Sequence, residues 1–144
     1  MRQGLLIAVL GMGLGLFGCG PIVLEEEDQP MPVLSLGKDP FTLQSVSVSG
    51  DFLEVETSYG GGCEKHSFWV EWDGVFLESL PVQARLVVRH EARNDRCLAL
   101  IGSDKRRFDL SPLKEAYRRG YREQQGSIVL RVQDAPAGSV VYTF

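Results

Sequence analysis

Two cysteines and two histidines are the side chains in this sequence of 144 residues that are best suited to chemistry: Cys63, His66, His90 and Cys97. Cysteine and histidine are the usual ligands of zinc, and a set of two of each is a recognised zinc site. Two cysteines can instead form a disulfide, which would remove both thiolates from such a site. Whether the cysteines bind zinc or form a disulfide depends on whether the chain is exported to an oxidising compartment.

The N-terminus is typical of an exported protein. Arg2 is the only charge before Glu25, and a 14-residue apolar run, Gly4 to Phe17, follows it. A membrane-spanning helix needs about 20 residues. A short positive start with a short apolar run indicates a secretory signal peptide, and we assign residues 1–18 to it.

The run ends in Leu16-Phe17-Gly18-Cys19, which resembles the lipobox of bacterial lipoproteins over these four positions. The resemblance implies that Cys19 becomes the diacylated first residue of the mature chain, anchored in the membrane by its acyl chains, palmitate among them. Gly20 stands where an Asp would imply retention in the inner membrane, so the resemblance implies an extracytoplasmic location at the outer membrane. The alternative is ordinary secretion, with cleavage near Gly18 or Gly20 and an unmodified Cys19.

With Cys19 lipidated, two cysteines remain in an oxidising compartment, and the expected product is a Cys63–Cys97 disulfide. The bridge would close a loop of about 35 residues. Thiolate zinc sites are disfavoured where thiols oxidise, so we expect no metal and no cofactor. The alternative is a metal site centred on His66 and His90, with the two cysteines, or with Glu64 or Asp95 in place of them.

A hydrolytic site is a second alternative. Ser67 or Ser79, His66 or His90, and Asp95 contain the residue types of a Ser-His-Asp triad, but no spacing selects them. The sequence has no Gly-x-Ser-x-Gly motif. We therefore predict that the protein is not an enzyme.

Six basic residues lie within 18 positions and could contact an anionic surface, such as lipopolysaccharide phosphates or the acidic patch of a protein: Lys105, Arg106, Arg107, Arg118, Arg119 and Arg122. Acidic residues are interspersed among them, which favours a solvated helix and turn instead. The net charge of -4 gives no support for nucleic-acid binding.

The composition divides the mature chain into two parts. Residues 19–32 contain four consecutive acids, Glu25 to Asp28, and three prolines, which predicts an extended tether without a partner. Residues 33–144 are enough for one domain with a single core.

Short alternating runs separated by turn residues predict an all-β domain, an Ig-like β-sandwich of about seven strands. Ser45 to Ser49 and Leu53 to Tyr59 flank Gly50-Asp51 and predict a hairpin. Ser127 to Val132 and Ser139 to Phe144 predict two late strands.

One short helix is expected between Ser111 and Gly120. Ser111 is the candidate N-cap, Pro112 suits the first helical position, and Gly120 suits the C-terminal exit. Arg118 and Arg119 would favour the C-terminus through the helix dipole. Core contacts are expected from Leu113, Ala116 and Tyr117.

The central hairpin would bring the histidines together. We predict an antiparallel pairing with residue numbers that sum to 156, which places His66 opposite His90 and Phe68 opposite Val88. Val70 would then face Leu86, Trp72 would face Ala84, Trp69 would face Val87 and Glu71 would face Arg85. Both cysteines would lie at the histidine end of this hairpin.

The segments Tyr59 to His66, Asn94 to Cys97 and Phe108 to Ser111 resemble motifs of small secreted bacterial domains to which no activity is attached. The resemblance implies a single stapled domain and supplies no function. The sequence therefore predicts a lipid-anchored cell-envelope protein with a non-catalytic binding or structural role. Its partners would be the membrane and either an envelope protein or an anionic surface.

Overall fold

A computed structural model describes residues 22–24 and 37–144. The described chain contains one helix, α1 (Ser111–Tyr121), and eight strands. The strands are β1 (Ile22–Leu24), β2 (Thr42–Ser49), β3 (Phe52–Gly61), β4 (Ser67–Leu77), β5 (Val82–Glu91), β6 (Ala99–Asp109), β7 (Ser127–Val132) and β8 (Ser139–Thr143).

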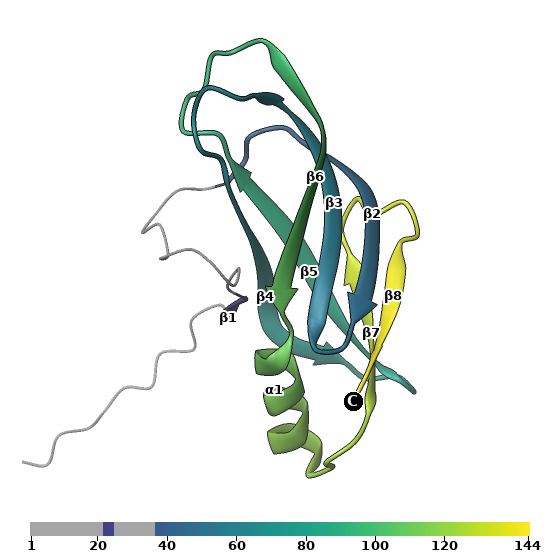
Figure 1. Ribbon diagram of the computed structural model, residues 1–144. Coiled ribbons are helices and arrows are strands. Elements are labelled where there is room, and N and C mark those ends of the chain that lie inside the picture. Colours follow the sequence, from purple (N-terminus) through teal and green to yellow (C-terminus); the bar gives the residue numbers. More distant parts are fainter. Residues whose placement is uncertain (1–21, 25–36) are drawn as a thin grey trace, which may run out of the picture.

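The strands form two sheets, which confirms the predicted all-β sandwich with one short helix (Figure 1). The larger sheet has the order β1-β4-β5-β7-β8, and the smaller sheet has the order β2-β3-β6. Neighbouring strands are antiparallel except β5 and β7, which are parallel. α1 lies at one end of the sandwich, between β6 and β7 in the chain.

The core follows from the alternation of apolar and polar residues along the strands. Alternate residues of a strand face opposite sides, so each strand contributes one apolar row to the space between the sheets. In β5, for example, Val82, Ala84, Leu86 and Val88 are buried, and Gln83, Arg85 and Val87 are not. Trp72, Phe108 and Tyr142 are the largest of the fully buried side chains.

The predicted register of the central hairpin is wrong by two residues. Phe68 pairs with His90, Val70 with Val88 and Trp72 with Leu86; beyond an irregularity at residues 73–75, Phe76 pairs with Ala84. A two-residue shift keeps every side chain on its predicted face, so the hydrophobic pattern could not distinguish the two registers. The shift places Trp69 opposite Arg89 and Glu71 opposite Val87, and Glu71 forms an ion pair with Arg89 (2.8 Å).

Both predicted ends of α1 are shifted, although the helix itself and Pro112 in its first turn are confirmed. Leu110 occupies the N-cap, and Ser111 is the first helical residue. The Asp109 carboxylate accepts the backbone N–H of Ser111 (2.8 Å), one of the N-terminal N–H groups that have no partner within the helix. Gly120 stays inside the helix, which ends where Arg122 adopts left-handed backbone angles (φ 60°). Leu113 is buried, and Ala116 and Tyr117 pack against the core as predicted.

Part of the predicted tether is paired with the domain. Residues 22–24 form β1, which runs antiparallel to β4 with Ile22 opposite Trp72 and Leu24 opposite Val70. The signal peptide, Cys19 and the acidic run lie outside the described residues. Within the described part of the chain, no helix is long and apolar enough to cross a membrane.

Candidate functional site

The end of the sandwich opposite α1 contains the predicted disulfide. Cys63, just after β3, is bonded to Cys97, just before β6, and their Cα atoms are 5.9 Å apart. The bridge connects the β3–β4 loop to the β5–β6 loop. Both cysteines and both histidines therefore gather at one end of the molecule, as the sequence predicted.

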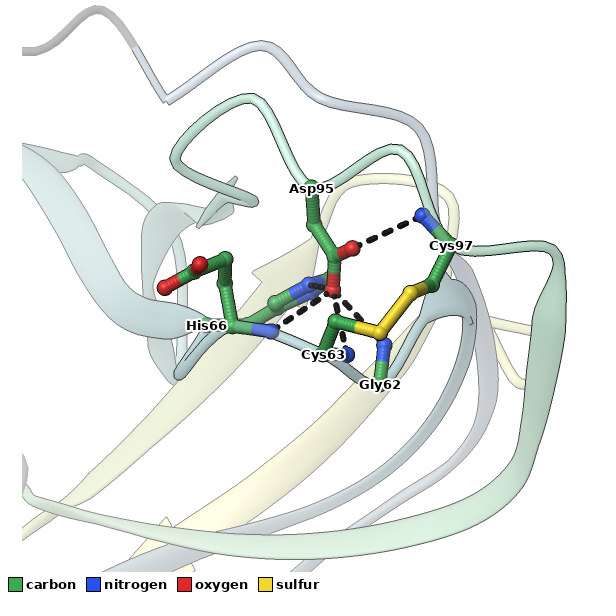
Figure 2. Close-up of a disulfide and its surroundings, with 6 residues drawn as sticks. Gly62, Cys63, His66, Asp95 and Cys97 are labelled. Carbon is green, nitrogen blue, oxygen red and sulfur yellow. Dashed lines mark hydrogen bonds and ion pairs between the residues drawn. A yellow bond between two sulfur atoms is a disulfide. The ribbon is translucent and has the colours of Figure 1, made fainter.

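Asp95 is the central residue of this end (Figure 2). One carboxylate oxygen, Oδ2, accepts the backbone N–H groups of Gly62 (2.7 Å), Cys63 (2.9 Å) and Glu64 (3.0 Å). The other oxygen, Oδ1, accepts the N–H of Cys97 (2.9 Å). Asp95 thus bonds the backbone on both sides of the disulfide and joins the same two loops a second time.

The glycines before Cys63 make this arrangement possible. Gly61 and Gly62 have φ values of 134° and 105°, which turn successive N–H groups toward the carboxylate. A Cβ atom on Gly61 would lie 2.6 Å from the His66 ring and 2.8 Å from Asp95 Oδ2. Only glycine combines this backbone angle with the close approach of the histidine and the carboxylate.

The Asp95 carboxylate is charged and almost inaccessible to solvent, since its side chain is 1% exposed. The backbone N–H groups of Glu64 and Cys97 hold the pKa of this carboxyl far below its usual range, and the His66 ring and the N–H of Cys63 act in the same direction. Burial opposes this shift and is outweighed. The Asp95 carboxylate is therefore a buried negative charge that hydrogen bonds within the protein stabilise.

His66 continues the network away from Asp95 toward the core. Its Nε2 is 3.0 Å from Asp95 Oδ2, and its Nδ1 is 2.8 Å from His90 Nε2. The Nδ1 of His90 is in turn 3.3 Å from the backbone carbonyl of Asp39. Both rings are buried, and aromatic side chains enclose them: Tyr59 contacts both, and Phe68 stacks on His90 with ring centroids 4.3 Å apart.

The hydrogens that this hydrogen-bond network requires can be counted. A carboxylate and a carbonyl lie at its two ends, and both only accept. Three hydrogen bonds along the chain then require three N–H groups, whereas two neutral imidazoles supply two. Two neutral imidazoles therefore satisfy two of the three contacts, and the third requires a second hydrogen on one of the rings.

The lowered pKa of His90 predicts a loss of stability in mild acid. Burial lowers the pKa of His90, and the neighbouring His66 acts in the same direction, although its contacts with Asp39 and Pro40 oppose the shift. As the pH falls through the usual histidine range near 6.5, the unfolded chain binds a proton that the folded ring refuses. The free energy of unfolding should fall, by at most about 1.4 kcal/mol per pH unit for one proton.

Urea unfolding at a series of pH values between 5 and 8 measures this dependence. The free energy of unfolding of the variant His90→Gln should depend less on pH, because the variant lacks the ring whose pKa differs between the folded and unfolded forms. The carboxyls with lowered pKa values, Asp95, Asp51 and Glu56, titrate below this window and do not contribute to the slope. An unchanged slope in the variant would contradict a lowered pKa of His90 in the folded protein.

The residues of the alternative metal site lie close together, but the two cysteines are disulfide-bonded and offer no thiolate. Ligand atoms of Cys63, Asp95 and Cys97 lie within 4.8 Å of one another, but the two sulfurs are bonded to each other. The imidazoles of His66 and His90 contact each other, and their nitrogens are engaged in the network with Asp95 and the carbonyl of Asp39. A set of two cysteines and two histidines would require reduction of the disulfide.

The residues of the alternative hydrolytic site are only partly brought together. Asp95 and His66 are in contact, but the second nitrogen of His66 faces His90. The Ser67 hydroxyl accepts a hydrogen bond from Arg93 (3.2 Å), and Ser79 lies in the turn at the far end of the β4–β5 hairpin.

The six basic residues proposed for anionic contact lie on two elements that follow each other in the chain, β6 and α1. Three of them lie on β6: Lys105, Arg106 and Arg107. Arg106 is paired with Asp104 (2.6 Å) and Arg107 with Glu54 (3.5 Å). The other three lie on α1 and at its C-cap: Arg118, Arg119 and Arg122.

Two participants in the site were not identified from the sequence. Asp39 supplies the carbonyl at the inner end of the histidine chain, and its carboxylate accepts the N–H of Ala92 (2.7 Å). Tyr59 covers both rings, and its hydroxyl donates to Asp104 (2.8 Å). Nothing in the local sequence marks Asp39, whereas Tyr59 could have been placed from the alternation of β3.

The site consequently combines a disulfide, a buried carboxylate and a histidine pair into one network that ties the β3–β4 and β5–β6 loops to the core. Comparison of the chain with family models, curated proteins and solved structures finds no match.

Proposed function

We propose that this protein is a lipid-anchored lipoprotein of the bacterial cell envelope with a non-catalytic, structural or binding role. The observation that carries the proposal is the Cys63–Cys97 disulfide. Such a bridge persists in an oxidising compartment, which agrees with export directed by residues 1–18. It also leaves Cys19 as the one cysteine outside the bridge, at the position that resembles a lipobox cysteine.

The geometry around the disulfide supports a structural role for the polar residues. Asp95 accepts four backbone N–H groups and the His66 ring, so its hydrogen-bonding capacity is used within the protein. Both nitrogens of His66 are likewise engaged. A catalytic base needs a nitrogen or oxygen within reach of a substrate proton, and these groups are instead used to hold two loops together.

The proposed anchor defines the partners. Acyl chains on Cys19 would hold the protein at the membrane, and more than one chain is needed for stable attachment. With Gly20 after the modified cysteine, we assign the protein to the outer membrane. The further partner would be an envelope protein or an anionic surface.

Expression of the full chain with its own signal in a double-membraned bacterium tests the proposal. The mature protein should begin at a diacylated Cys19, incorporate labelled palmitate and have a mass two hydrogens below that of its reduced form. The variant Cys19→Ser should incorporate no palmitate and still form the disulfide if its domain reaches the periplasm. A mature protein released into the periplasm with an unmodified Cys19 would refute the anchor, and stoichiometric zinc on reduced cysteines would refute the structural role.

A further inference from the structure

The direction in which the chain enters the sandwich determines which end can approach the membrane. β1 is antiparallel to β4, so the N-terminal end of β1 points toward the end of β4 that leads into the β4–β5 turn. Cys19 precedes Ile22 by three residues, and a fully extended chain of that length spans at most about 11 Å. The proposed anchor point is therefore held near the domain.

The disulfide end lies in the opposite direction. Ile22 is opposite Trp72, and β4 extends five residues, or about 17 Å, from Trp72 back to Ser67. Cys63 and Cys97 lie beyond that point. The N-terminal end of β1 therefore points away from the disulfide.

The α1 end presents side chains that suit a lipid surface. Leu80, in the β4–β5 turn, is fully exposed, and Val75 is 55% exposed. Figure 1 shows this turn and α1 at the same end of the sandwich, and the hydroxyl of Tyr121 donates to Glu78 (3.0 Å), which joins them. Exposed apolar side chains without a protein contact are suited to the interfacial region of a bilayer.

The same end carries basic side chains directed to solvent. Arg119 and Arg122 are exposed at the C-terminal turn of α1. The ion pair of Arg119 with Glu115 is long (3.7 Å), and both of its side chains are about two-thirds exposed, so Arg119 remains able to bind another anion. Basic residues beside a membrane anchor are attracted to anionic lipid headgroups.

We propose that the end formed by α1 and the β4–β5 turn is the membrane-facing surface of this protein, with anionic phospholipid as its partner. The inference rests on the proposed lipid anchor, which places the bilayer within reach of β1. It assigns Leu80 and Val75 to the headgroup region and Arg119 and Arg122 to its phosphates. The disulfide end then points away from the bilayer.

Two fully exposed leucines at opposite ends provide a matched test. Leu80 lies at the α1 end, and Leu98 lies next to Cys97 at the disulfide end. The variants L80W and L98W each add one tryptophan to the same background, Trp69 and Trp72. Each full-length, processed protein is reconstituted into vesicles of phosphatidylethanolamine and phosphatidylglycerol, with and without bromine on the acyl chains.

Brominated lipid should quench the tryptophan added at position 80 beyond the quenching of the parent, and the tryptophan added at position 98 should show no such increase. Replacing phosphatidylglycerol by phosphatidylcholine should reduce the quenching at position 80. Stronger quenching at position 98, or equal quenching at both positions, would overturn the orientation. Flotation of the parent with the vesicles tests the anchor separately: a protein that floats but shows no quenching at position 80 refutes only the orientation, and one that does not float refutes the anchor as well.

Discussion

Replacing both Cys63 and Cys97 by serine should lower the free energy of unfolding by about 3–4 kcal/mol, because the bridge closes a loop of roughly 35 residues in the unfolded chain. The two cysteines are 34 positions apart, and their Cα separation of 5.9 Å lies in the usual range for a disulfide. Since a small domain has a total stability of only about 5–15 kcal/mol, the loss should be evident in the urea midpoint.

The parent protein under reducing conditions is the internal control for this measurement. Reduced parent and double variant should unfold at similar urea concentrations, since both lack the covalent loop and keep Asp95. Equal urea midpoints for the oxidised parent and the double variant would show that the bridge contributes no stability. The comparison also separates the disulfide from the hydrogen bonds that connect the same two loops.

Replacing Asp95 by alanine should destabilise the protein strongly, and we expect a much larger drop in the thermal midpoint than for Asp73→Ala. Asp95→Ala would leave four backbone N–H groups and the His66 ring without their acceptor, in a place where the carboxylate is 1% exposed. Unsatisfied donors at buried positions are costly. The ion pair of Asp73 with Arg85 has both side chains about half-exposed and should contribute less than about 1 kcal/mol.

The variant Asp95→Asn distinguishes charge and acceptor capacity from shape. Asparagine has nearly the same outline, but one of its two terminal atoms donates instead of accepting. Whichever way the amide is oriented, its NH2 group would meet an N–H, either that of Cys97 or those of the Gly62–Glu64 turn. We therefore expect Asn to rescue little of the stability lost in Asp95→Ala, and full recovery would contradict the role of Asp95 as an anionic acceptor.

Two carboxylates with lowered pKa values should make the folded protein less stable in strong acid. Because the pKa of Asp95 is lowered in the folded protein, its contribution to stability is complete above the usual aspartate range near 4 and is lost as the pH falls below it. The same holds for Asp51, whose pKa is lowered first by its contact with Lys114 and then by the Tyr142 hydroxyl. The loss near neutral pH comes instead from His90, as described above.

The sequence by itself determined the features that depend on local pattern or on residue counts. Strict alternation in Ser45 to Ser49 and Leu53 to Tyr59 predicted β2 and β3 and the turn between them, because a strand with one buried face must alternate. With Cys19 assigned to lipidation, the two remaining cysteines predicted the Cys63–Cys97 pair. The helix followed from Pro112 and from the spacing of Leu113, Ala116 and Tyr117.

The tertiary structure alone decided which groups meet. Registers that differ by two residues bury the same side chains, so only the packed sheets could set Phe68 opposite His90. Asp95 was one of several acids in the sequence, and its role arises from four N–H groups that two loops bring together in space. The contact between His66 and His90 likewise joins residues 24 positions apart, and His90 also contacts the carbonyl of Asp39, 51 positions away. Such contacts depend on distances between segments far apart in the chain, and neither periodicity nor composition contains them.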